Sequence, residues 1–147
     1  MDETPAENPV SNDEILFRRV PETFMCNGLS FQAFMPNKTD STGISLSRSS
    51  FFADDPVRFA STGRIGKKYY VARLIAAGVR SLGLEVVPRP EPDNPGHAEI
   101  PDLNHSQTRT IKKQLAPALA NAVLSVEGPF PGLRHRDAPT TEVEMDP

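Results

Sequence analysis

Residues 69–88 read YYVARLIAAGVRSLGLEVVP, and this stretch decides the expected fold. Its first part, residues 69–76, is rich in β-branched and aromatic side chains and predicts a strand. A helical turn over residues 77–82 is closed by a glycine, and a second strand, LEVVP, follows over residues 84–88. Because no long crossover helix separates these strands, we expect antiparallel pairing and an α+β fold rather than a doubly wound sheet.

The segments on either side add strands to a small, mainly antiparallel sheet. After an Asn-Gly turn, LSFQAF over residues 29–34 alternates at the period of a strand. ISLSR over residues 44–48 places two apolar and two serine side chains on opposite faces, as a half-buried strand does. HAEI, residues 97–100, is a further short strand. Residues 14–20 are expected to pass from a helical turn into a strand.

Helices are expected at two places. An aspartate cap followed by Pro56 predicts one short helix in the middle of the chain. A longer C-terminal helix, capped by Asn104 or Ser106, carries apolar residues at helical spacing. Pro117 lies inside it and is expected to kink or split it.

The composition divides the chain into one domain and two tails. Residues 1–13 and 128–147 are acidic and rich in proline, which predicts disordered tails around a single folded domain over residues 14–127. The whole chain of 147 residues has a net charge of −3, but nine of its 19 acidic residues lie in residues 1–14 and 137–147. Between them 16 basic residues face 10 acidic ones, and a basic body of this kind favours an anionic partner.

Two absences in the sequence indicate a cytoplasmic setting. The single cysteine, Cys26, excludes an internal disulfide bond, which fits a reducing compartment. No apolar run has the length of a membrane span, and the acidic N-terminus has no secretory signal. We therefore expect no membrane partner.

The tripeptide His97-Ala98-Glu99 matches the first motif of the zinc-dependent nucleobase deaminases. Those enzymes also need a downstream pair of cysteines as metal ligands, and this chain has no cysteine after position 26. The sequence therefore excludes a deaminase of this type. His97, Glu99, Asp102 and His105 fall within nine residues, but their spacing matches no metal signature, so no metal or cofactor is expected.

The basic residues are densest between Arg58 and Arg80, a stretch without any acidic residue. A loop with two glycines lies in it beside two tyrosines, and such a loop can present backbone N–H groups and cationic side chains to phosphate. The pattern is not a P-loop. The ligand-binding residues expected from this stretch are Arg64, Lys67, Lys68 and Arg73.

A second interpretation is enzymatic. Arg18 or Arg19 on a first strand, Ser47 on a middle strand and Glu99 on a late strand follow the order of one branch of ADP-ribosyltransferases. In that branch the arginine and serine hold a dinucleotide and the glutamate polarises the ribose. The likeness is one of order, and no full motif accompanies it.

An ordered set of segments resembles a scattered group of small, uncharacterised bacterial proteins. They are ILFRRV at residue 15, SFQAFMP at 30, ISLSRSS at 44 and GLEVVPRPEPDNPGHAEI at 83, followed by a helix rich in alanine and leucine. The resemblance covers roughly residues 14–122 and implies a bacterial, cytoplasmic protein. It brings no activity, cofactor or site residue with it.

Within these segments, four polar residues beside strand apolar positions are further candidates for ligand binding: Arg18, Ser47, Arg48 and His97. We expect a small binding or accessory domain that favours an anionic ligand, namely a nucleotide, a nucleic acid or the acidic surface of a protein partner. The alternatives are the nucleotide-substrate enzyme described above and a scaffold protein for a larger effector. A binding role is expected over a catalytic one.

Overall fold

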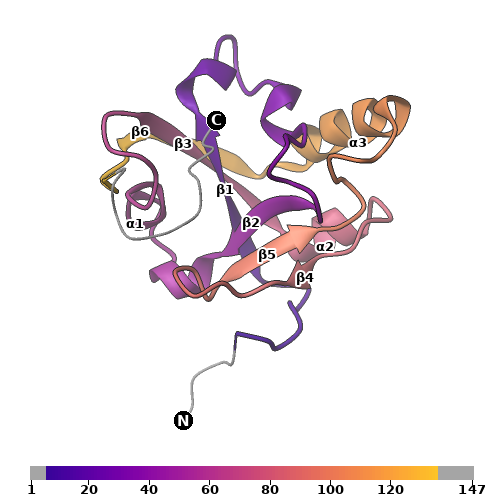
Figure 1. Cartoon of the computed structure of the whole chain (residues 1–147), viewed down its shortest axis with the longest axis horizontal. Helices are drawn as coiled ribbons and strands as arrows, with labels where there is room; N and C mark the ends of the chain where they lie inside the picture. The colour runs from indigo at the N-terminus through magenta and orange to yellow at the C-terminus, as the bar shows by residue number, and fades with distance from the viewer. Residues whose placement is uncertain (1–5, 136–147) are drawn as a thin grey trace.

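The computed structural model describes residues 6–135, and the fold is α+β (Figure 1). One antiparallel six-stranded sheet has the order β4-β5-β2-β1-β3-β6. Its strands are β1 (Ile15–Pro21), β2 (Ile44–Arg48), β3 (Lys68–Ile75), β4 (Val87–Pro88), β5 (His97–Ile100) and β6 (Ser125–Pro131). The helices are α1 (Pro56–Ala60), α2 (Ala76–Arg80) and α3 (Arg109–Ala122), with 3-10 turns η1 (Glu22–Phe24), η2 (Phe31–Phe34) and η3 (Ser49–Phe52).

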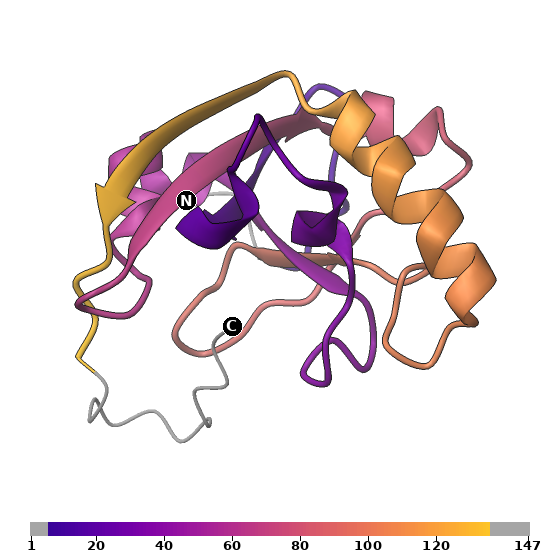
Figure 2. The same cartoon turned by 90° about the horizontal axis from the view of Figure 1, so that it is seen from above.

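Each face of the sheet is covered by its own apolar cluster. The larger cluster packs α2, α3 and η2 against residues such as Leu16, Leu46 and Leu74. A smaller cluster on the other face packs α1 against Phe17 and Val71. In Figures 1 and 2, α3 and α1 accordingly lie on opposite sides of the sheet. Alternation along each strand therefore buries side chains on both faces.

The sheet opens between its two central strands. β1 pairs with β3 along its whole length, from Ile15 to Pro21, and all of Ile44–Ser47 in β2 pairs with β5. β1 and β2 pair with each other only at Leu16↔Arg48 and Phe17↔Ser47. The strands then separate, and the guanidinium group of Arg18 bridges the gap by donating to the carbonyl oxygen of Ser45 at 2.7 Å.

Most of the expected strands are confirmed. β2 and β5 have the predicted bounds, and β3 is displaced by one residue from residues 69–76. The segment 29–34 was predicted as a strand, and this is wrong. Ser30 instead accepts a hydrogen bond from the Gln32 amide and caps the 3-10 turn η2. A serine cap thus outweighed a short alternating pattern. Of residues 84–88, Val87–Pro88 alone pair as a strand.

The helices follow the predicted caps with small shifts. Asp55 caps α1 and accepts from the Val57 amide at 2.9 Å. Thr108, rather than Asn104 or Ser106, caps α3, which runs as one helix through Pro117. Within the described residues, no helix is long and apolar enough to cross a membrane.

Both predicted tails are partly structured, which corrects the expected boundaries. Val10 is buried in the core, and Arg48 holds the backbone around it. At the other end, residues 128–131 continue β6. Proline fits in β6 because β6 is an edge strand. Such a strand pairs on one side only, so a residue without an N–H group can face away from the sheet. The predicted disorder of residues 1–5 and 136–147 lies outside the described residues.

Candidate anion-binding cavity

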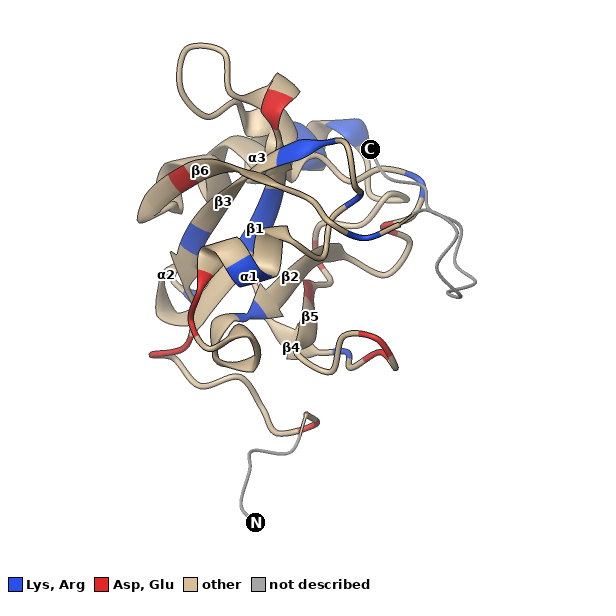
Figure 3. Cartoon of the chain, turned by 90° about the vertical axis from the view of Figure 1, so that its left-hand side faces the viewer, with Lys and Arg blue, Asp and Glu red and all other residues tan. Residues whose placement is uncertain are grey.

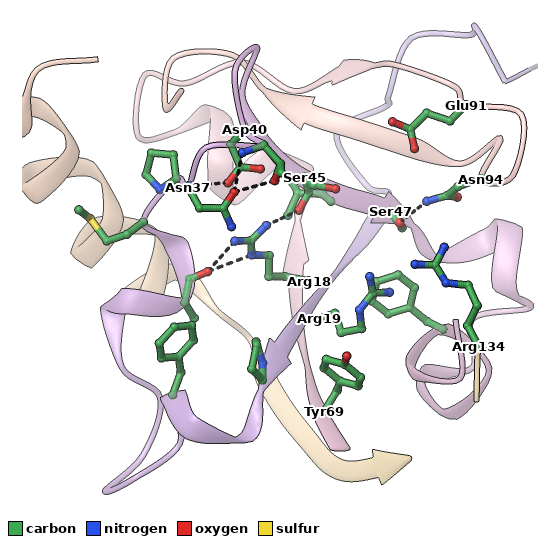
Figure 4. A pocket seen from close by; sticks show the side chains of 18 of the residues that line it. Arg18, Arg19, Asn37, Asp40, Ser45, Ser47, Tyr69, Glu91, Asn94 and Arg134 are labelled. Carbon is green, nitrogen blue, oxygen red and sulfur yellow. Dashed lines mark hydrogen bonds between the residues drawn. The ribbon is translucent and has the colours of Figure 1, made fainter. Parts of the chain in front are cut away.

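A cavity of about 720 Å³ occupies the opening between β1 and β2 (Figure 4). The turns η1 and η2 line one end, and the loop of residues 91–94 lines the other. Three arginines line it, namely Arg18, Arg19 and Arg134, together with three carboxylates, Asp40, Glu91 and Asp93. The cavity therefore carries charged groups of both signs, and its size is that of a small-molecule site.

Arg18 is held in the cavity by backbone carbonyl groups. Its Nε and Nη2 atoms donate to the Ala33 carbonyl oxygen at 3.0 and 2.8 Å, and Nη1 donates to the Ser45 carbonyl oxygen. The Phe34 ring lies 5.7 Å from the guanidinium carbon. A guanidinium group has five N–H donors. Two of the five therefore have no partner among the described residues.

Burial dominates the electrostatics of Arg18. It lowers the pKa of the guanidinium group, the charge of Asp40 opposes this shift, and neighbouring Arg19 adds to it. No carboxylate of the described residues forms an ion pair with Arg18. The positive charge is thus desolvated but compensated by carbonyl dipoles and a distant carboxylate.

Asp40 is the acidic counterpart of Arg18 in the cavity wall. Its side chain is buried and accepts a hydrogen bond from the Asn37 amide at 2.8 Å. Burial raises the pKa of Asp40, while the charge of Arg18 and the Asn37 hydrogen bond act against the increase. Ionisation of this carboxyl group is therefore disfavoured by its surroundings.

Arg19, the next residue of β1, also lines the cavity and lies against aromatic rings. Its guanidinium carbon is 5.3 Å from the centre of the Phe59 ring and 5.4 Å from that of Tyr69. Tyr69 needs Gly63 beside it, because a Cβ atom there would lie 2.3 Å from the tyrosine ring. The hydroxyl of Tyr69 also accepts from the Arg64 amide at 3.1 Å. This packing fixes the ring and, with it, the arginine above it.

Ser45 and Ser47 of β2 lie on the same face of the sheet, because alternate residues of a strand share a face. Asn94 Nδ2 donates to Ser47 Oγ at 3.1 Å, and Asn94 Oδ1 is a buried acceptor with no partner within residues 6–135. Ser45 Oγ lies 2.8 Å from His97 Nε2. Ser45, Ser47 and Asn94 line the cavity, and in Figure 4 Arg134 lies on the side of Ser47 and Asn94.

Of the four strand residues expected to bind a ligand, two line the cavity. They are Arg18 and Ser47. His97 is buried behind Ser45 and reaches the cavity through it. Arg48 lies elsewhere, buried against Glu14 and the N-terminal segment.

The basic stretch does not gather around the cavity. Arg64, Lys67, Lys68 and Arg73 are not among its lining residues. Arg73 pairs with Glu127 on β6, and Arg80 pairs with Glu85, each at 2.8 Å. Figure 3 shows basic residues spread over several elements with acidic ones between them. Neighbours in sequence are dispersed here because alternate strand residues face opposite ways.

The residues suggested for a transferase or a metal are likewise separated. Arg19 and Ser47 line the cavity, but Glu99 does not. Its Oε1 atom accepts from Thr42 at 2.7 Å and from Arg89 at 3.2 Å. Among residues 6–135, no three histidine, cysteine, aspartate or glutamate side chains are arranged to hold a metal ion.

Sequence reasoning missed Asp40, Asn94, Ser45 and Arg134. Asp40 and Asn94 lie in polar loops and Ser45 lies on a strand with alternating serines, but nothing in the sequence indicated that the three line one cavity. Comparisons with protein-family models, curated proteins and solved structures found no match to this chain. The resemblance to small bacterial proteins stays a prediction.

Proposed function

We propose that this protein binds a nucleotide-sized anionic ligand in the cavity between β1 and β2. The observation that carries the proposal is Arg18, a half-buried guanidinium group that lines the cavity and keeps two N–H donors without a partner in the described residues. A charge that is partly removed from water is stabilised by a paired opposite charge. A phosphate or carboxylate group supplies both the opposite charge and two acceptors in the planar geometry that arginine prefers.

The other lining residues extend the recognition beyond one anionic group. Arg19 and Arg134 add positive charge, while Ser47 and Asn94 offer polar contacts. The carboxylates Asp40, Glu91 and Asp93 accept hydrogen bonds, so they favour a ligand with hydroxyl or amino groups as well as a negative charge. A nucleotide combines these features.

A small molecule is favoured over a nucleic acid. Nucleic-acid binding draws on many exposed phosphate contacts along a continuous basic surface. Here Arg73 and Arg80 are engaged with acidic partners on other elements.

A thermal-shift panel of inorganic pyrophosphate, ADP, NAD⁺ and a short RNA tests the proposal. A small anion present at 100 times its Kd is expected to stabilise the wild type by about 2.7 kcal/mol. Arg18→Gln should abolish this shift. Arg109→Gln, which removes an exposed arginine on α3, should leave it intact. No shift with any small anion, or an equal shift in the Arg18→Gln protein, would refute the proposal.

Two other functions make different predictions on the same panel. The transferase alternative draws on Arg19 and Ser47, which both line the cavity, although Glu99 does not. It predicts NAD⁺ consumption by the wild type that Glu99→Gln abolishes, and a wild type that leaves NAD⁺ intact excludes it. The scaffold alternative predicts a co-purifying protein and no stabilisation by small molecules.

A further inference from the structure

The hydrogen-bonded pair Ser45 and His97 has no role in the proposed anion binding. Ser45 Oγ is 2.8 Å from His97 Nε2, although 52 residues separate them in the sequence. The two residues come from the neighbouring strands β2 and β5. Ser45 is half-buried and lines the cavity, while the imidazole is 6% exposed. A hydroxyl thus faces a cavity with a shielded imidazole behind it.

The second ring nitrogen fixes the direction of this hydrogen bond. His97 Nδ1 lies 2.9 Å from the carbonyl oxygen of Arg89, which can only accept. The proton of a neutral imidazole must therefore lie on Nδ1, and Nε2 must accept from the Ser45 hydroxyl. This is the tautomer in which the imidazole can take the serine proton as a base.

A carboxylate also lies beside the imidazole. Glu91 Oε2 is 3.5 Å from Nδ1 of His97. A carbonyl oxygen and a carboxylate together orient the ring, as the third member of a nucleophile–base arrangement does.

Arg18 supplies the remaining electrostatic element. Its Nη1 atom binds the backbone carbonyl of Ser45, so the guanidinium group is adjacent to the hydroxyl-bearing residue and lines the same cavity. Its two N–H groups without a described partner are directed by a fixed guanidinium plane. Negative charge that develops on an acyl oxygen at Ser45 meets this positive field.

We propose that Ser45 is a nucleophile toward a carboxylic ester, with His97 as its general base. Ser45 Oγ forms a bond to the acyl carbon while its proton passes to His97 Nε2. The ester C–O bond then breaks, and the departing alkoxide takes that proton and leaves as an alcohol. Water attacks the acyl-serine by the same route, with His97 as base, and releases the carboxylic acid and free Ser45.

A fluorophosphonate probe tests the nucleophile directly. Attack by Ser45 forms an O–P bond, fluoride leaves, and the serine proton is taken by His97. Trypsin cleavage after Lys38 and Arg48 releases a peptide of residues 39–48, and fragment masses within it separate Ser45 from Ser41 and Ser47. The label is expected on Ser45 of the wild type. An unlabelled protein, or a label on a different residue, overturns the proposal.

Variants test the base and separate this proposal from anion binding. His97→Gln should slow labelling roughly 100-fold or more, within the range of general-base effects. His105→Gln replaces an exposed histidine and should label at the wild-type rate. Because His97→Gln can weaken the fold, the labelling rate is compared in variants whose melting shows a folded protein, and Ser45→Ala serves as the second variant. Equal rates in His97→Gln and wild type contradict the proposal, as does undiminished labelling of Ser45→Ala.

Hydrolysis of p-nitrophenyl acetate gives a second readout. The wild type is expected to release p-nitrophenol faster than a folded Ser45→Ala protein, and equal rates contradict the proposal. Ser45→Ala should still bind pyrophosphate. A wild type that binds pyrophosphate but is not labelled would therefore reject the nucleophile and leave the anion site standing.

Discussion

The buried Arg48 and the half-buried Arg18 show at the scale of single residues how a structural role differs from a binding role. Arg48 makes five hydrogen bonds with its five N–H groups, two to Glu14 and three to the carbonyl oxygens of Ala6, Asn8 and Pro9. Arg18 makes three. Arg48 therefore holds the fold together, whereas Arg18 keeps capacity for a ligand.

Asp40→Asn should strengthen the binding of inorganic pyrophosphate. The change removes a carboxylate whose charge acts on Arg18, so a bound anion meets less repulsion. We expect a Kd roughly fivefold lower, the scale of one charge at several ångströms in a partly polar site. Isothermal titration measures it. Because misfolding cannot improve affinity, weaker or unchanged binding by a folded Asp40→Asn protein would count against the site.

The sequence identified part of this site, but it could not show that Arg18 has a binding role and Arg48 a structural one. Arg18 and Arg48 both stand on strands beside apolar residues, so both were expected to bind a ligand. What distinguishes them is the number of carbonyl groups within reach, and these come from distant segments. Ser45 and His97 were visible as polar strand residues, but their contact depends on the β2–β5 register.

At the scale of elements, the strands were predictable and the opening between them was not. Alternating apolar and serine residues marked β2, and β-branched and aromatic residues marked β3 because such side chains fit a pleated surface. The gap arises because β1 stays paired with β3 while β2 stays paired with β5. The two central strands, β1 and β2, therefore separate after Phe17. That divergence is a property of four strands together, and no local pattern records it.

Pro117→Ala tests the helix that closes one face of the sheet. Proline inside α3 provides no N–H for the carbonyl of Lys113 and crowds that group. Alanine restores the hydrogen bond, so the free energy of unfolding should rise by roughly 1–3 kcal/mol. Urea denaturation measures the change. A lower stability of Pro117→Ala would show that the proline ring packs in a way that the helix requires.

At the scale of the whole molecule, the N-terminal segment belongs to the fold. Val10 is 3% exposed in the main core, and Arg48 donates hydrogen bonds to the carbonyl oxygens of Asn8 and Pro9, the two residues before Val10. The acidic and proline-rich composition of this segment predicted disorder because composition records no long-range contacts. The hydrogen bonds of Arg48 to three carbonyl oxygens hold this N-terminal segment in place.

Removal of residues 1–13 should therefore destabilise the protein. The truncation exposes the surface that Val10 covers and takes three carbonyl partners from Arg48. We expect a loss of about 2–4 kcal/mol, the sum of one buried valine and a partly unsatisfied buried charge. An unchanged denaturation midpoint of the truncated protein would mean that the segment contributes nothing to stability.

The Glu14–Arg48 pair should make stability fall in acid. Burial raises the pKa of Glu14, but its hydrogen bonds with Arg48 and Ser11 and the charge of Arg48 outweigh this, so the pKa lies below its ordinary value of 4.5. A group whose pKa is lowered by folding stabilises the protein above the unfolded-state pKa and loses that contribution as the pH falls. The stability difference between wild type and Glu14→Gln should be constant above pH 4.5 and shrink below it. A difference that does not change with pH would contradict the pairing.

The most direct measurement of the central claim is the ¹⁵N NMR signal of the Arg18 guanidinium group during titration with inorganic pyrophosphate. Assignment by comparison with Arg18→Gln identifies the resonance, and Arg109 serves as an internal reference. The account predicts a saturable shift of the Arg18 signal with the Arg109 signal unmoved. An Arg18 signal that stays in place while pyrophosphate perturbs basic residues elsewhere would contradict it.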